Sequence, residues 1–196
     1  MNHSSDLIDE LVREHVKPDL KELGFKCKAS TFFRQNGELT EVIAPQKSKW
    51  NEAQEAKFTV NLGVYWPSVQ ETLDRACKSF PPKEYECTLR QRLGPLFDQN
   101  RDFWWTVTPQ SDVAKIGMEV AEKIKVFALP WLYSASSLDE VVKIAHTNEA
   151  AVFHVMKGER AEASALIEEA INKTKLAKPF LRSLAAKLGL EISALV

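Results

Sequence analysis

The chain has 196 residues, 44% of them hydrophobic and 27% charged, with a formal net charge of -1. This length allows one domain with a proper core or one domain with an appendage, and the balanced charge disfavours classes that bind nucleic acid or acidic membranes through a positive field. The three cysteines are dispersed without a C-x-x-C pair, which argues against a disulfide framework or a zinc cluster. We see no signal peptide and no apolar run of about 18 residues, and we expect a cytoplasmic protein without membrane contact.

Residues 5–23 carry apolar side chains at helical spacing, which predicts an amphipathic helix. Gly24 follows the last apolar residue, where a glycine commonly ends a helix. Pro18 lies inside the pattern and cannot donate a backbone hydrogen bond. We therefore expect a kink or a second helical segment at this proline.

Alternating side chains over residues 25–35 predict a strand. Asn36-Gly37 then predicts a two-residue hairpin turn of type I′, because both of its central residues need positive φ. The returning strand is predicted at residues 39–46, and the polar residues 48–57 are expected to form a loop. The clearest strand pattern follows at residues 57–66.

Ser68-Val69-Gln70-Glu71 has the spacing of a capping box and predicts a short helix over residues 68–79, stopped by Pro81-Pro82. Two more strands are predicted near residues 85–93 and 103–107. Short turns favour antiparallel pairing of the five strands, because a parallel pair needs a crossover of about a dozen residues. The helix over residues 68–79 could supply one such crossover.

Beyond Ser111 the apolar spacing becomes helical, and Ser137-Leu138-Asp139-Glu140 is a second capping-box pattern. Gly158 separates two short helices that look like one helical hairpin of a tetratricopeptide-type repeat; without a second copy, a lone hairpin covering one end of the sheet is expected. The fold class is α+β: a mainly antiparallel sheet of about five strands packed with helices, followed by a helical segment. We predict a core domain at residues 1–135 and a helical extension packed on it at residues 136–196.

The sequence contains no recognisable motif for catalysis, metal binding or nucleotide binding. Residues 98–109 begin with the spacing of a calcium loop but lack its glycine and its final glutamate. The four histidines form no zinc-binding pair, and the seven glycines are isolated, so no phosphate-cradling loop is present. We therefore predict no catalytic residue, no metal ligand and no cofactor.

Aromatic and basic residues carry what functional signal there is. Trp104-Trp105 must face opposite sides of a predicted strand, so either both faces are covered by helices, which we favour, or one ring lines a groove. Residues 46–50, with Lys26, Lys28 and Arg34, could form a basic patch for an anionic ligand, a phosphate backbone or an acidic partner. Edge-strand protection by lysines is the alternative that we narrowly favour.

The order and spacing of several segments resemble a bacterial family, number 4304 among the domains of unknown function. The segments are Gly24-Phe25-Lys26, Thr31-Phe32-Phe33-Arg34, Gln46-Lys47-Ser48-Lys49-Trp50, and Phe58-Thr59-Val60-Asn61-Leu62-Gly63-Val64. The resemblance covers about residues 7–130 and implies a bacterial cytosolic protein. It transfers no catalytic residue.

Two functional hypotheses follow. The first is a non-catalytic protein-binding module, such as an immunity protein that neutralises a toxin, with another protein as its partner and no clear nucleic-acid ligand. The second is a small-ligand binder or an enzyme with an unrecognised site near residues 46–50. The candidate binding residues are Arg34, Gln46, Lys47, Lys49, Trp50, Asn61, Tyr65 and Trp66.

Overall fold

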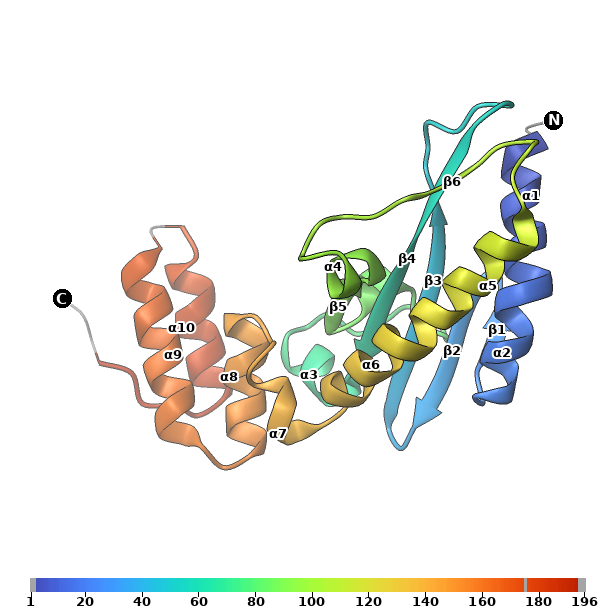
Figure 1. Cartoon of the computed structure of the whole chain (residues 1–196). Coiled ribbons are helices and arrows are strands. Elements are labelled where there is room, and N and C mark those ends of the chain that lie inside the picture. The colour runs from blue at the N-terminus through green and yellow to red at the C-terminus, as the bar shows by residue number, and fades with distance from the viewer. Residues whose placement is uncertain (1–2, 175, 194–196) are drawn as a thin grey trace.

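The computed structural model describes residues 3–174 and 176–193. A twisted antiparallel sheet carries a layer of helices on one face, and a group of helices follows beside it (Figure 1). The predicted α+β class is confirmed, with six strands in place of about five. The strands are β1 (Lys26–Lys28), β2 (Thr31–Asn36), β3 (Leu39–Lys47), β4 (Ala56–Tyr65), β5 (Leu89–Arg92) and β6 (Trp105–Val107).

The central strand β4 organises the sheet. The strand order is β1-β2-β3-β4-β5, and β6 also pairs with β4. Both β5 and β6 bond to β4, at Asn61–Val64 and at Ala56–Phe58 respectively. All these pairs are antiparallel, so the helix after β4 supplies no parallel crossover.

The prediction of one strand over residues 25–35 is wrong, because the chain turns at Ala29-Ser30 and forms the hairpin β1–β2. Both residues have positive φ, 47° and 65°, as a type I′ turn requires. Neither residue is a usual choice for this conformation, so residue type carries no signal for the turn.

The second hairpin is confirmed, but its turn lies one residue later than predicted. Asn36 pairs with Leu39, so the two turn residues are Gly37 and Glu38. Gly37 has a φ of 60°, while Glu38 does not adopt positive φ. A glycine at the first central position is the signature of a type II′ turn.

The first helix continues past Pro18. It comprises α1 (His3–Leu11), a π-helical turn η1 (Val12–Val16) and α2 (Lys17–Glu22), and the N–H of Lys17 donates to the carbonyl of Val12. The wider turn lets the helix continue through the proline, which lacks an N–H. Gly24 follows α2 with a φ of 84°, which confirms its expected role.

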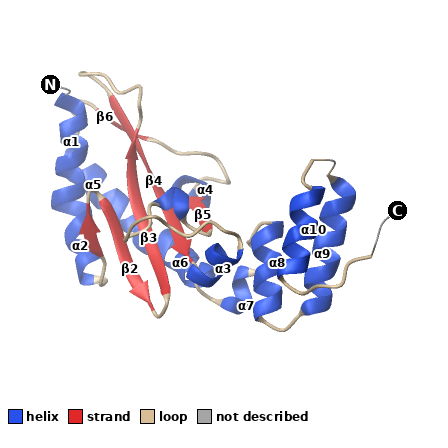
Figure 2. Ribbon diagram, turned by 180° about the vertical axis from the view of Figure 1, so that it is seen from behind, coloured by secondary structure: helices blue, strands red, loops and turns tan. Residues whose placement is uncertain are grey.

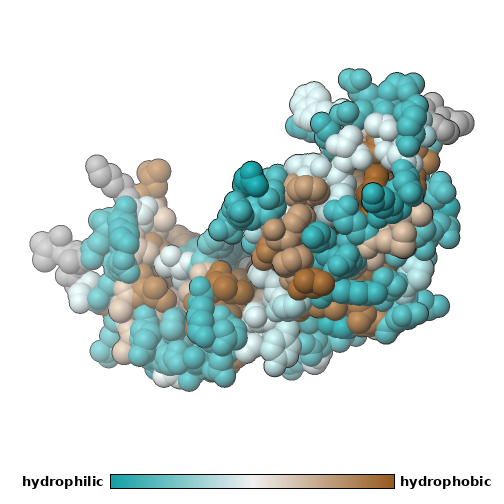
Figure 3. All heavy atoms as spheres, viewed as in Figure 1, coloured by the Kyte–Doolittle hydropathy of each residue, from teal (hydrophilic) through white to brown (hydrophobic). Residues whose placement is uncertain are grey.

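The same arrangement recurs in the second long helix, made of α5 (Val113–Lys123), η3 (Ile124–Ala128) and α6 (Leu129–Ala135). Another π-helical turn precedes another proline, Pro130. The two long helices pack on each other and on β4, whose residues Phe58, Val60, Leu62 and Val64 are fully buried. Figure 3 shows the outer side of this layer, where hydrophobic side chains are interspersed with hydrophilic ones.

The helix α3 (Pro67–Thr72) is shorter than predicted and begins at Pro67. Ser68 is therefore not its N-cap, and the predicted capping box is wrong. The helix stops early because the chain adopts a left-handed conformation at Asp74, with a φ of 58°. Two short elements, η2 (Glu84–Glu86) and α4 (Leu93–Phe97), flank β5 and were not predicted.

The C-terminal helices are α7 (Leu138–Val141), α8 (Thr147–Met156), α9 (Arg160–Lys173) and α10 (Lys178–Lys187). Gly158, with a φ of 82°, joins α8 to α9 and confirms the helical hairpin. Ser137 precedes α7 but makes no capping hydrogen bond with its side chain. The hairpin meets the sheet where the ring of Phe153 packs edge-on against Trp66, with centroids 5.0 Å apart. In the described part of the chain, no helix is long and apolar enough to cross a membrane.

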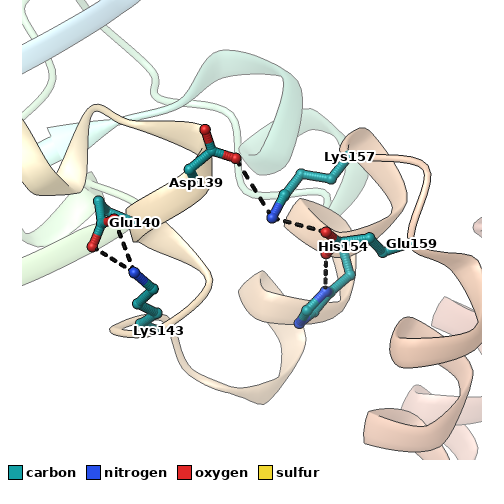
Figure 4. Close-up of polar contacts among 6 residues, drawn as sticks. All are labelled: Asp139, Glu140, Lys143, His154, Lys157 and Glu159. Atoms are coloured by element: carbon teal, nitrogen blue, oxygen red, sulfur yellow. Dashed lines mark hydrogen bonds and ion pairs between the residues drawn. The ribbon is translucent and has the colours of Figure 1, made fainter.

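A polar network fastens α7 to this hairpin (Figure 4). One carboxylate oxygen of Glu159 lies 2.8 Å from the Lys157 ammonium, and the other lies 2.7 Å from Nδ1 of His154. Lys157 also lies 3.6 Å from Asp139 of α7. Hydrogen bonds from Lys157 and His154 lower the pKa of Glu159 below its usual value, and the bond from Lys157 has the larger effect.

This network predicts a pH-dependent contribution to stability. A carboxyl whose pKa is lowered by folding stabilises the protein above its unfolded pKa of about 4.3, and that stabilisation is lost as the pH falls through the folded pKa. Glu159→Gln should therefore lower the melting temperature at pH 7, and the difference from the wild type should shrink toward pH 3. Thermal unfolding at both pH values measures this; a difference that stays constant would contradict the assignment.

Candidate functional site

The register of the strands assigns the predicted site residues to opposite faces of the sheet. Gln46, Asn61 and Tyr65 point to the face away from the helix layer, since they alternate with the residues of β3 and β4 that face the core. We call this the open face, and Figure 2 views the sheet from this side. Arg34 and Lys47 point to the helix side, since Arg34 pairs with Glu41 and Lys47 pairs with Phe58 in the ladder. The eight predicted residues therefore do not form one site.

The open face is partly covered by the segment that joins α3 to β5. Its Cys87 lies directly over Gly63, where an added Cβ would come within 2.6 Å of the thiol sulfur. Farther along, the backbone N–H of Cys77 donates to the hydroxyl of Tyr65 at 2.9 Å. Burial raises the pKa of both the Tyr65 hydroxyl and the Cys87 thiol. The predicted site residue Tyr65 therefore anchors this segment to the sheet.

Beside this anchor the open face carries a pocket of about 810 Å³, which we call the basic cleft. Its floor is formed by β3 and β4, and its walls by the β1–β2 turn, β5 and residues 79–85. Gln46, Lys47 and Asn61 are the predicted residues among its lining. Its cationic residues are Lys28, Lys47, Lys83, Arg90 and Arg92, against one carboxylate, Glu84, among the described lining residues.

Two of these cations are free of carboxylates. The ammonium of Lys28 donates to the carbonyl of Phe80 at 2.9 Å, and that of Lys83 lies over the Tyr85 ring, 5.7 Å from its centroid. Among the described residues, neither lysine has a carboxylate within ion-pair distance. Their charges are therefore available to an anion in the cleft.

The two arginines are held in place by their own carboxylates. Nε of Arg90 donates to Glu84 at 2.7 Å, and Arg92 bonds to Asp102 while its guanidinium lies 5.3 Å from the Trp104 ring centroid. Each pair uses one edge of the guanidinium fork and leaves other N–H groups for a ligand. Fixed arginines of this kind lose little side-chain entropy on binding an anion.

The floor between these cations is small and polar. The amide of Asn61 donates to Oε1 of Gln46 at 2.7 Å, and Ala44 lies opposite Asn61 in the ladder. This bond fixes the orientation of both amides. The Nδ2 donor of Asn61 is thereby directed at its neighbour, and the Gln46 side chain keeps its own amide donor for a ligand.

The remaining predicted site residues make their main contacts away from the basic cleft. Lys47 lines the cleft, but its ammonium bonds to Asp9 at 2.7 Å and to the Ser5 carbonyl at 2.8 Å, on the helix side. Trp50 is 79% exposed in the β3–β4 loop, with the Lys49 ammonium 5.1 Å from its ring centroid. Trp66 is buried and donates through Nε1 to the Ala135 carbonyl at 3.0 Å.

Trp104 and Trp105 differ in burial, as expected for adjacent residues whose side chains point in opposite directions. Trp105 is buried and stacks on Phe58, with centroids 5.4 Å apart, whereas Trp104 is half-buried under Arg92 at the sheet edge. The expectation that helices cover both faces is wrong, because the open face is covered in part by an irregular segment.

Sequence reasoning missed Lys83, Arg90 and Arg92. The sequence does contain a signal for Arg90 and Arg92, because they stand at alternate positions of a predicted strand and such residues share one face of the sheet. No sequence pattern indicated that residues 79–85 would lie above that face. Among the described residues, no group of His, Cys, Asp and Glu side chains is arranged to hold a metal ion.

Comparison with known proteins adds one finding. The model of a family described as a domain of unknown function (DUF4304) matches residues 16–134. The matched segment contains every strand and the whole basic cleft. It confirms the resemblance drawn from the sequence, with limits of 16 and 134 in place of about 7 and 130. No curated protein and no solved structure matches the chain.

Proposed function

The chain belongs to the DUF4304 family, a domain of unknown function, and we propose from its geometry that it is a non-catalytic protein-binding module. The basic cleft takes an acidic segment of a partner protein. An immunity-like role, in which the module binds and neutralises a toxin in the bacterial cytoplasm, is one setting that fits this mode of binding. The observation that carries the proposal is the pair of uncompensated lysines, Lys28 and Lys83, on two walls of the cleft.

Electrostatics supports an acidic partner. Carboxylates of a bound segment would gain charge-assisted hydrogen bonds from the lysines and from the free N–H groups of Arg90 and Arg92. Complementary charge of this kind chiefly sets partner choice and the rate of association. Although the whole chain is nearly neutral, the cleft concentrates positive charge where a partner can reach it.

The chemistry of the lining supports binding without catalysis. Its described residues include no histidine and no cysteine, and Glu84, its carboxylate, is engaged by Arg90. General acid–base catalysis needs a titratable group that can reach the substrate with a suitable pKa. A lining of lysines, arginines and amides suits recognition of an anion better.

The proposal predicts that an acidic peptide binds the cleft. A fluorescein-labelled decapeptide of alternating Glu and Gly should bind with a salt-sensitive affinity, measured by fluorescence anisotropy at 50 and 300 mM NaCl. Lys28→Ala with Arg92→Ala should weaken binding about tenfold, at roughly 0.7 kcal/mol for each partly exposed ion pair.

Lys115→Ala with Arg182→Ala is the matched control, because it removes one lysine and one arginine from exposed helix positions away from the cleft. This control should bind as the wild type does. Equal weakening in both double variants, or equal binding of the Gln analogue of the peptide, would overturn the proposal.

A small anionic ligand is a second candidate, favoured by the size of the cleft. Its volume of about 810 Å³ lies within the range of roughly 300–1,000 Å³ that is usual for small-molecule sites. A ligand or substrate that fills it should raise the melting temperature in a thermal-shift screen of nucleotides, sugar phosphates and dicarboxylates. The Lys28→Ala, Arg92→Ala variant should lose the shift; a hit that it retains would place the ligand elsewhere.

A further inference from the structure

The basic cleft runs across the strands, and this direction sets the spacing of the charges that a ligand meets. Lys28 pairs with Thr31, Ala44 pairs with Asn61, and Asn61 pairs with Arg92. The β2–β3 ladder ends at the pair Phe32–Ile43, and one step further along the same register Thr31 comes opposite Ala44. One row of residues on the open face therefore leads from Lys28 on β1 to Arg92 on β5.

The length of this row follows from the sheet geometry. Four strand spacings of about 4.8 Å separate β1 from β5, so the Cα atoms of Lys28 and Arg92 lie roughly 19 Å apart. An extended peptide advances about 3.3 Å per residue and needs about six residues to cover that distance. A helix would need about twice as many, because it rises about 1.5 Å per residue.

The two end charges cannot easily converge on one acidic group. The Lys28 ammonium is held at the Phe80 carbonyl, and Phe80 itself packs edge-on against Phe33 with centroids 5.4 Å apart. At the other end, Arg92 is held by Asp102 and Trp104, which lie outside the cleft lining. Both anchors are thus fixed at opposite ends of the row.

The middle of the row is suited to main chain and small side chains. Ala44 leaves space over β3, and the Gln46–Asn61 amide pair offers polar groups to a peptide backbone. Lys83 on the covering segment adds a third positive charge to the cleft.

We propose that the cleft recognises an extended segment of a partner protein that carries two acidic residues about six positions apart, one bound by Lys28 and the other by Arg92. This inference rests on the proposed function and adds the partner's conformation and spacing to it. The spacing is a property of the sheet, so it distinguishes this mode from attraction by net positive charge.

Peptides with equal charge and different spacing test the inference. Two fluorescein-labelled nine-residue peptides of Gly and Ser carry two Glu residues, at positions 2 and 8 or at positions 4 and 6. Both place their carboxylates on one side of an extended chain and differ in the distance between them. The wide spacing should bind about threefold tighter, the size of one additional partly exposed ion pair.

Single variants then assign the anchors. Lys28→Ala and Arg92→Ala should each abolish the preference for wide spacing, because only one anchor remains, whereas the control Lys115→Ala should preserve it. Equal binding of the two peptides by the wild type overturns the spacing rule and leaves the proposed function standing. No difference between either Glu peptide and its Gln analogue overturns both. Tighter binding of a ten-nucleotide single-stranded DNA than of the wide-spaced peptide would show that the cleft serves nucleic acid instead.

Discussion

Replacing Arg34 by alanine is expected to lower the free energy of unfolding by about 3 kcal/mol. Arg34 binds the carboxylate of Glu41 through Nε at 2.7 Å and through a terminal nitrogen at 2.6 Å. The Glu41 side chain is only 2% exposed, so the substitution leaves a buried charge without its partner. Breaking a buried ion pair costs about 3–5 kcal/mol of stability. We expect a loss at the lower end of this range, because the Arg34 side chain is 32% exposed.

Urea unfolding measures this loss, and two further variants identify its cause. Adding Glu41→Gln to Arg34→Ala should recover part of the stability, because the buried charge is then removed as well. Arg13→Ala is the control, since Arg13 and its partner Glu14 are both exposed and the pair should contribute little. A loss below about 1 kcal/mol for Arg34→Ala would contradict the structural role assigned to this predicted site residue.

Gly63→Ala is expected to destabilise the protein by about 1–3 kcal/mol and to displace the segment that covers the open face. The new Cβ would lie 2.6 Å from the sulfur of Cys87 and 2.8 Å from its Cβ. β4 is the central strand and cannot move easily, so the segment carrying Cys87 must shift. The basic cleft should change with it, because the same segment forms one of its walls.

The displacement can be followed through the reactivity of the thiol. In a Cys27→Ser, Cys77→Ser background, Cys87 should react slowly with Ellman's reagent, because burial both shields it and raises its pKa. Gly63→Ala should accelerate the reaction. Adding Cys87→Gly to Gly63→Ala removes the Sγ and Cβ atoms that the new methyl group would meet, and should restore part of the stability. This double variant has no thiol at position 87, so only its stability is measured. Unchanged stability and reactivity in Gly63→Ala would show that no close approach exists.

The sequence predicted those parts of the fold that depend on local periodicity. The alternation along β4 and the glycine after α2 are read directly from residue type, and both are confirmed. The turn at Ala29-Ser30 was missed because neither residue favours positive φ; in the structure it joins the paired strands β1 and β2. The π-helical turns were also missed, because Pro18 was expected to interrupt its helix, whereas the wider turn lets the helix continue through it.

The candidate site was predicted in part for a related reason. Gln46 and Asn61 were both among the predicted residues, and the register of β3 and β4 sets them on one face of the sheet. Alternation puts Lys47 on the opposite face from Gln46, and its ammonium bonds to Asp9 and Ser5 on the helix side although the residue also lines the cleft. The course of residues 79–85 over the sheet depends on long-range contacts, such as that between Phe80 and Phe33, that no local pattern encodes.

The most direct test of the account is a ¹H–¹⁵N NMR titration of the whole chain with the wide-spaced acidic peptide. We predict that the largest shift changes follow the row from Lys28 through Ala44 and Asn61 to Arg92, with further changes in residues 79–85. Changes centred on Trp50 or on the helices α8–α10, or no changes at saturating peptide, would contradict the assignment of the basic cleft as the binding site.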